Sequence, residues 1–176
     1  MSGHLTLALA GNPNAGKTSI FNALTGSRQH VGNWPGKTVA RHEGTFRHGN
    51  LVGRLVDLPG TYSLSALSPE EVIARDYLLS GEADGVINVV DATNLERNLY
   101  LTAQLLELGL PMVVALNVSD SARAQGIRID VPRLGVLLGR APIVETVGHR
   151  GRGLDELIEA AIGLVGTDGA LLRVVA

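Results

Sequence analysis

The amino-acid sequence predicts an α/β fold: a six-stranded, mostly parallel sheet with one antiparallel hairpin strand and helices on both faces. Three observations predict it. Apolar runs of strand length alternate along the chain with longer segments of helical periodicity. The turn signal His48-Gly49-Asn50 joins two strand-like segments with no helix between them, which is typical of a hairpin. The chain has 176 residues, 45% of them hydrophobic, enough to bury the core of one such domain.

Each element follows from its own segment. The apolar runs predict strands near residues 5–10, 40–48, 51–57, 84–90, 111–116 and 141–146. Helical periodicity predicts helices near residues 17–25, 69–80, 94–108, 131–138 and 153–165. We expect residues 1–165 to form one domain and residues 166–176 to be a linker or the start of a regulatory region. Within that tail, 166–169 has linker composition, and 171–175 fits a short strand or a frayed helix.

The segment between the first strand and the first helix matches the phosphate-binding pattern G-x-x-x-x-G-K-[ST] at every fixed position. We expect it to bind a nucleotide through Gly11, Asn12, Pro13, Asn14, Ala15, Gly16, Lys17, Thr18 and the next residue, Ser19. Its backbone N–H groups can surround phosphate oxygens, Lys17 can add a positive charge, and the Thr18 hydroxyl can ligate Mg²⁺. A chance glycine-rich turn is the alternative, and the strand–loop–helix context disfavours it.

A second motif, Asn117-Val118-Ser119-Asp120, follows the apolar run 112–116 and indicates which base is bound. A carboxylate at Asp120 can accept hydrogen bonds from both N1–H and the exocyclic amino group of guanine, and adenine has no such pair of donors. The alternative is that Asp120 only caps a helix or turns a loop. The order of phosphate loop, Asp57-Leu58-Pro59-Gly60 and N-x-x-D along the chain favours the guanine reading.

The motif Asp57-Leu58-Pro59-Gly60 ends the strand at 51–57 and is expected to respond to the γ-phosphate. The Asp57 carboxylate can hold Mg²⁺ through water, and the Gly60 N–H can approach the γ-phosphate. An ordinary strand-end turn is the alternative. Thr61 follows, where Ras-like enzymes carry a glutamine that orients the attacking water. Therefore either GTP hydrolysis is slow, or other groups position the attacking water.

The loop from Arg28 to Val39 has no apolar periodicity, so we expect little core burial and an order that depends on the γ-phosphate. Its candidate switch residues are Gly32, Asn33, Trp34, Pro35, Gly36, Lys37 and Thr38. The Thr38 hydroxyl is the candidate group that closes on Mg²⁺. Trp34 is either exposed and involved in loop position or a packing anchor, and the sequence leaves both open. We assign catalytic roles to Asn14, Lys17, Thr38 and Gly60.

These residues resemble the N-terminal GTPase domain of the FeoB ferrous-iron transporter family over roughly residues 5 to 165. The matches include 11–26 and 57–64, and the tryptophan loop 32–39 and the stretches 68–78 and 90–99 are the most specific parts of the likeness. The resemblance implies a P-loop GTPase (Ras-like) fold and GTP hydrolysis that regulates or drives Fe(II) uptake. It also implies a place on the cytoplasmic face of the bacterial inner membrane, beside the membrane portion of the same transporter, and a possible homo-oligomer.

The resemblance further implies a slow, K⁺-stimulated enzyme. The Asn14 side chain and the carbonyls of Gly32 and Trp34 would hold K⁺ beside the phosphates, and the cation would stabilise developing charge. Thr146, Val147 and Gly148 lie where such proteins contact guanine through backbone groups. Val118 stands where most GTPases have lysine and where the family usually has another apolar residue. Val147 cannot supply a hydroxyl to brace its loop, so we expect low guanine affinity and fast GDP release. The chain also stops at Ala176, where the family continues into a helical regulatory segment and a membrane portion.

Composition excludes several other classes. The absence of cysteine excludes disulfides and thiolate metal sites and suits the cytosol. A net charge of −2 offers no basic surface for nucleic acid, so we expect no nucleic-acid partner. The five histidines have no ligand spacing, so no iron site is placed here. No apolar run reaches the roughly 18 residues of a membrane span, and the start of the chain lacks signal-peptide features.

Two other functions stay open on the residues alone. The first is a soluble K⁺-dependent GTPase that acts on the ribosome or on tRNA. It would share the phosphate loop but would be expected to carry a basic RNA-binding extension, and the sequence has none. The second is a module that binds nucleotide and signals by occupancy without catalysis. The missing glutamine at Thr61 favours this second reading slightly.

Overall fold

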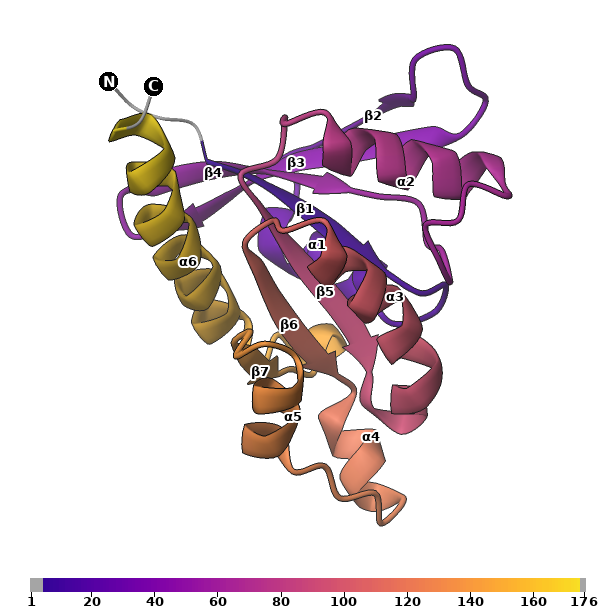
Figure 1. The fold of residues 1–176 in the computed structure, drawn as a ribbon, viewed down its shortest axis with the longest axis vertical. Helices are drawn as coiled ribbons and strands as arrows, with labels where there is room; N and C mark the ends of the chain where they lie inside the picture. Colours follow the sequence, from indigo (N-terminus) through magenta and orange to yellow (C-terminus); the bar gives the residue numbers. More distant parts are fainter. Residues whose placement is uncertain (1–4, 175–176) are drawn as a thin grey trace.

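The computed structural model describes residues 5–174, and the side chains of residues 5–166. Its strands form one sheet in the order β2-β3-β4-β1-β5-β6-β7 (Figure 1). They are β1 (Thr6–Gly11), β2 (Gln29–Asn33), β3 (Ala40–His48), β4 (Leu51–Asp57), β5 (Gly85–Asp91), β6 (Met112–Asn117) and β7 (Ile143–Glu145). β3 is antiparallel to β2 and β4, and the other neighbours are parallel. The predicted α/β class and hairpin at 40–57 are confirmed.

The sheet has seven strands, so the predicted number of six is wrong. The extra strand, β2, lies inside the segment that was expected to be a loop. All five of its residues are exposed, so it carries no alternation of apolar and polar side chains. Its backbone pairs with β3 from Gln29 opposite Gly44 to Asn33 opposite Ala40. Backbone pairing at the edge of the sheet therefore forms a strand that side-chain patterns do not reveal.

Helices cover both faces of the sheet (Figure 1). They are α1 (Lys17–Thr25), α2 (Pro69–Leu79), α3 (Leu95–Glu107), α4 (Ser119–Ala124), α5 (Val131–Leu137) and α6 (Leu154–Val174), with 3₁₀ turns η1 (Ala92–Asn94) and η2 (Gly148–Arg150). Helix α4 was not expected. None of the described helices is long and apolar enough to cross a bilayer.

Helix α6 continues through residues 166–169, where a linker was expected. That expectation came from glycines, but a glycine inside a helix costs only about 1 kcal/mol relative to alanine. The apolar face of α6 upstream, with Leu157 and Ile158 fully buried against the sheet, anchors the helix. Residues 171–174 are also helical, whereas Val175 lies outside the described residues. The domain boundary at residue 165 stays a prediction.

Alternating side chains of the central strands build a core on each face of the sheet. In β1, Ala8 and Ala10 belong to the cluster under α2 and α3, whereas Leu7 and Leu9 belong to the cluster under α1 and α6. This two-sided burial explains why β1, β5 and β6 are nearly continuous apolar runs. The loops after β1, β4, β6 and β7 leave the carboxyl edge of the sheet, where ligands bind in folds of this kind.

Candidate nucleotide-binding site

The loop between β1 and α1 forms a compact turn around a cavity of about 460 Å³. The Ala15 N–H donates to the Asn12 carbonyl at 3.1 Å, and Asn14 and Gly16 take positive φ angles of 65° and 95°. Helix α1 begins at Lys17, so the N–H groups of its first turn lack helical acceptors and are available to an anion. The cavity is lined by Asn12, Pro13, Asn14, Gly16, Lys17, Thr18, Ser19 and Gly60. The predicted phosphate loop thus faces one concave site.

Lys17, which lines this cavity, forms an ion pair with Asp57. The Lys17 Nζ lies 2.6 Å from the Asp57 Oδ1, and their side chains are only 10% and 13% exposed. The register of β1 and β4 places Leu9 opposite Asp57, which brings the end of β4 to the phosphate loop. Mg²⁺ is usually held by one or two protein oxygens together with substrate phosphates and waters. The Asp57 carboxylate and the Thr18 hydroxyl supply such oxygens, so this donor set fits Mg²⁺.

Asn117 joins the phosphate loop to the loop after β7. Its Nδ2 donates to the Ala15 carbonyl at 3.0 Å. Its Oδ1 accepts from the Thr146 hydroxyl at 3.1 Å and from the Gly148 N–H at 3.0 Å. The side chain is 1% exposed, and a Cβ placed on Gly16 would collide with its amide. Asn117 therefore acts as the bridge of the site, holding three segments in one arrangement.

Asp120 lies in the first turn of α4, directly after this bridge. Its Oδ1 accepts from the Ser121 N–H at 2.8 Å, and its Oδ2 lies 3.9 Å from the Arg150 Nε. The carboxylate is one quarter exposed, so a base can reach it. Val118 takes φ 52° just before α4, an unusual conformation for a β-branched residue. The backbone turns sharply there, and the turn places Asp120 beside the loop that carries Thr146 to Gly148.

Trp34 is a packing anchor, the second of the two positions that the sequence left open, whereas residues 28–33 and 35–38 of its loop are exposed. Trp34 is 5% exposed and belongs to the core cluster. Its ring meets the Tyr77 ring of α2 edge-on at 5.4 Å, and the Arg41 guanidinium lies 4.5 Å from the Trp34 centroid. One buried aromatic residue in a polar segment produces no hydrophobic periodicity, so the sequence pattern does not predict the contact between Trp34 and Tyr77.

The contact between Trp34 and Tyr77 leaves two buried donors unpaired. Among the described residues, the Trp34 Nε1–H and the Tyr77 hydroxyl have no hydrogen-bond partner. Burial raises the pKa of Tyr77 to about 12. An unpaired buried donor costs roughly 1–3 kcal/mol, which offsets part of the gain from burying the rings. The packed position of Trp34 therefore carries a cost that release to water would remove.

The other switch residues of this loop lie apart from the phosphate loop. Within the described part of the chain, Thr38 is exposed, and neither it nor Gly32 nor Trp34 lines the 460 Å³ cavity. The Trp34 carbonyl accepts from the Lys37 N–H at 2.9 Å. The roles of Thr38 toward Mg²⁺ and of the Gly32 and Trp34 carbonyls toward K⁺ stay predictions, and they require this loop to move.

The segment after β4 packs tightly on the phosphate loop. The Thr61 N–H donates to the Gly11 carbonyl at 3.2 Å, and Thr61 is 5% exposed. A Cβ placed on Gly60 would lie 3.1 Å from the Pro13 Cα, so glycine suits this close approach. Farther along, the Leu67 N–H and then the Ser63 hydroxyl lower the pKa of the Glu71 carboxylate, by donating to it at 2.8 and 2.9 Å.

Sequence reasoning missed a contact between this segment and α3. The Arg97 guanidinium stacks 4.3 Å from the centroid of the Tyr62 ring. The Asn12 Nδ2 donates to the Arg97 carbonyl at 3.4 Å, which connects α3 to the phosphate loop. The partners are 35 to 85 positions apart in the chain, so no local spacing signals the contact.

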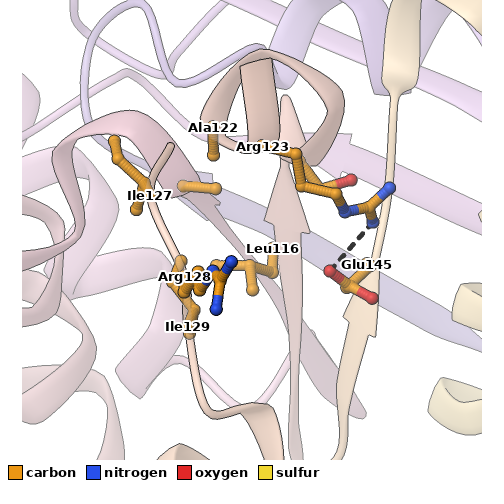
Figure 2. A pocket seen from close by; sticks show the side chains of 9 residues that line it. Leu116, Ala122, Arg123, Ile127, Arg128, Ile129 and Glu145 are labelled. Carbon is orange, nitrogen blue, oxygen red and sulfur yellow. Dashed lines mark hydrogen bonds and ion pairs between the residues drawn. The ribbon is translucent and has the colours of Figure 1, made fainter. Parts of the chain in front are cut away.

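A second cavity, of about 230 Å³, lies beside α4 and is drawn in Figure 2. Apolar side chains such as Leu116 and Ile127 line it, and Arg123 pairs with Glu145 across it at 3.1 Å. None of the residues that line it was predicted to contact phosphate, guanine or metal. The candidate nucleotide site is therefore the more polar cavity of about 460 Å³ at the carboxyl edge of the sheet.

Two solved structures with GDP and one isolated domain resemble this chain closely. The cytosolic domain of T. maritima FeoB in GDP form I has a TM-score of 0.89 at 47% identity, covering 94% of this chain and 64% of that one. An S. thermophilus NFeoB mutant bound to GDP scores 0.86 at 51% identity, covering 93% and 64%. The G domain of T. maritima FeoB scores 0.85 at 47% identity, covering 92% and 99%. The predicted P-loop GTPase (Ras-like) fold is confirmed.

Sequence relatives agree with these structures. The chain is 59% identical over 157 residues to the Fe(2+) transporter FeoB of Salmonella typhimurium and 58% identical over the same length to that of Escherichia coli strain K12. Each match covers 87% of this chain, which spans 20% of the length of the relatives. The family described as ferrous iron transport protein B matches residues 5–161. The chain belongs to the ferrous iron transport protein B family.

Proposed function

We propose that this chain is the GTP-binding and GTP-hydrolysing domain of a bacterial Fe(II) transporter. One observation carries the proposal: the buried Asn117 side chain ties the phosphate loop to the loop of Thr146 and Gly148, with Asp120 alongside. These bonds would hold the phosphate site beside the carboxylate that would read guanine. The family and the GDP-bound relatives support the same reading.

Each segment has its own task in binding. The backbone of residues 11–16 and the first turn of α1 surround the phosphates, and Lys17 adds its charge. Asp120 accepts from the guanine N1–H and amino group, and the backbone of 146–148 lines the base. Because Asp57 already holds Lys17 at 2.6 Å, phosphate oxygens and this carboxylate compete for the ammonium group. Phosphate binding would draw Lys17 away and free the Asp57 oxygens.

Thr18 and Asp57 are the residues that would hold Mg²⁺, and Thr38 would join them after the loop moves. A bound Mg²⁺ neutralises charge on the β- and γ-phosphates. Asn14 lines the same cavity and offers an amide oxygen for K⁺. Gly60 would present its N–H to the γ-phosphate. Thr61 is buried, and its N–H donates to the Gly11 carbonyl, so this residue is poorly placed to orient water. We therefore expect slow turnover.

GTP hydrolysis would regulate or drive ferrous iron uptake through the membrane portion of the same transporter. The domain would then work at the cytoplasmic face of the bacterial inner membrane, and a homo-oligomer is part of this proposal. The relatives are named as Fe(2+) transporters, and this chain spans 20% of their length, which leaves room for a membrane portion. The presence of apolar spans beyond codon 176 of the gene tests this half of the proposal, and a reading frame without them contradicts it.

Multiple-turnover phosphate release from Mg·GTP tests the enzymatic half. We expect measurable release in KCl and a slower rate in NaCl, since the smaller ion fits an amide-and-carbonyl cage poorly. Lys17→Ala is the control for contaminating activity. Release from GTP at the level of Lys17→Ala in both salts would contradict hydrolysis and leave only nucleotide binding.

A further inference from the structure

The segment that follows β4 is held at three consecutive residues. Gly60 packs on Pro13, and the Thr61 N–H donates to the Gly11 carbonyl at 3.2 Å. Tyr62, the third, turns outward and is 43% exposed, yet its ring is covered by the Arg97 guanidinium at 4.3 Å. The first two contacts are to the phosphate loop, and the third is to the first turn of α3.

Arg97 is itself fixed to the phosphate loop. The Asn12 side chain, 3% exposed, donates its Nδ2 to the Arg97 carbonyl at 3.4 Å. Asn12, Tyr62 and Arg97 also line one small cavity of about 150 Å³ together with Pro13 and Asn14. The stack on Tyr62 therefore closes a ring of contacts that runs from the phosphate loop to α3 and back through Thr61.

We propose that the Arg97–Tyr62 stack positions Gly60 and Thr61 for GTP hydrolysis, so that both members are positioning residues. This inference rests on the proposed function. Gly60 is the residue whose N–H would approach the γ-phosphate, and it lies two positions from the stacked ring. A small displacement of a group that contacts the reacting phosphate lowers the rate strongly, because catalysis here depends on positioning and electrostatics.

The expected effect is modest because both partners are partly exposed. A cation–π contact at an exposed site corresponds to about a two- to fivefold effect. Arg97→Met removes the guanidinium, and it keeps an unbranched side chain and the backbone carbonyl that accepts from Asn12. Tyr62→Leu removes the ring. Tyr62→Phe keeps the ring and tests whether the ring alone preserves the rate. The matched control is Tyr100→Leu, because Tyr100 is an exposed residue of α3, the helix that carries Arg97.

Steady-state phosphate release and GDP titration test the proposal. We expect Arg97→Met and Tyr62→Leu each to lower kcat about two- to fivefold, with KM and GDP affinity changed less than about twofold. The double variant should be no slower than the slower single variant, because either change removes the same contact. Tyr62→Phe and Tyr100→Leu should keep the rate of the unaltered chain. Multiplying effects in the double variant, or a loss in Tyr62→Phe equal to that in Tyr62→Leu, would overturn the proposal.

Hydrogen exchange separates a failure of this proposal from a failure of the proposed function. Amides of residues 60–64 should exchange faster in Arg97→Met than in Tyr100→Leu, whether or not the chain hydrolyses GTP. If the unaltered chain releases no phosphate, hydrolysis fails, and the exchange result still decides whether the stack holds the segment. Equal exchange in the two variants means that the stack does not stabilise residues 60–64, and this result overturns the inference.

Discussion

Asn117→Ala tests the bridge between the phosphate loop and the loop of Thr146 and Gly148, which we propose to contact guanine. The substitution removes three hydrogen bonds, each worth about 1 kcal/mol net, from a side chain that is 1% exposed. It also leaves the Ala15 carbonyl and the Gly148 N–H without this partner, which raises the expected cost to roughly 4 kcal/mol. Urea unfolding should show this loss as a lower free energy of unfolding, with the m-value unchanged.

GDP affinity should fall along with stability, because the two loops no longer share a partner. By calorimetry we expect the affinity for GDP to fall at least about tenfold, which corresponds to roughly 1.4 kcal/mol of binding free energy. Thr146→Val removes only one of the three bonds and should cost about 1 kcal/mol.

The matched control is Asn88→Ala. Asn88 is also 1% exposed, but its amide oxygen accepts from the Thr102 hydroxyl at 2.6 Å, within the core. It should lower stability by about 1–2 kcal/mol and leave GDP affinity unchanged. If Asn117→Ala binds GDP as tightly as Asn88→Ala does, the bridge does not organise the site and the reasoning fails.

Four further outcomes follow from the site. Asp120→Asn should weaken GDP at least about tenfold and favour xanthosine diphosphate, since an amide presents a donor to guanine donors; unchanged calorimetric affinity would refute the assignment. Asn14→Ala should abolish K⁺ stimulation and keep GDP binding, whereas a surviving K⁺ response would place the cation elsewhere. The fluorescence of the buried Trp34 should shift to the red with a non-hydrolysable GTP analogue, less so in Thr38→Ala; identical spectra in the empty, GDP and analogue states would contradict loop movement. Burial raises the pKa of Tyr77 from 10.0 to about 12, so stability that is present below pH 10 should be lost between pH 10 and 12. In Tyr77→Phe the free energy of unfolding in urea should depend less on pH over this range. An unchanged pH dependence would be evidence against this burial.

The sequence predicted those parts of the site whose chemistry depends on local spacing. The phosphate loop and Asp120 each come after a strand, Asp57 is the last residue of one, and the sheet brings all three to one edge. The hairpin at 40–57 was predicted for a similar reason, because its turn residues are adjacent in the chain. Gly49, at φ 57°, lies in that turn.

What the sequence did not predict depends on contacts between distant residues or on backbone alone. The amide of Asn117 bonds to a carbonyl 102 positions away, which no motif signals. Strand β2 forms by edge pairing without a buried side chain, and Trp34 is buried by a partner on α2. Helix α4 has six residues, too few to show helical periodicity.

Calorimetric titration of the chain with GDP and with ADP, in buffer containing Mg²⁺, tests the central claim most directly. The claim is that the phosphate loop and Asp120 form one guanine-nucleotide site. It predicts a single site for GDP and at least about tenfold weaker binding of ADP, because only guanine offers the paired donors that Asp120 accepts. Equal affinity for the two nucleotides, or no heat with millimolar GDP, would contradict it.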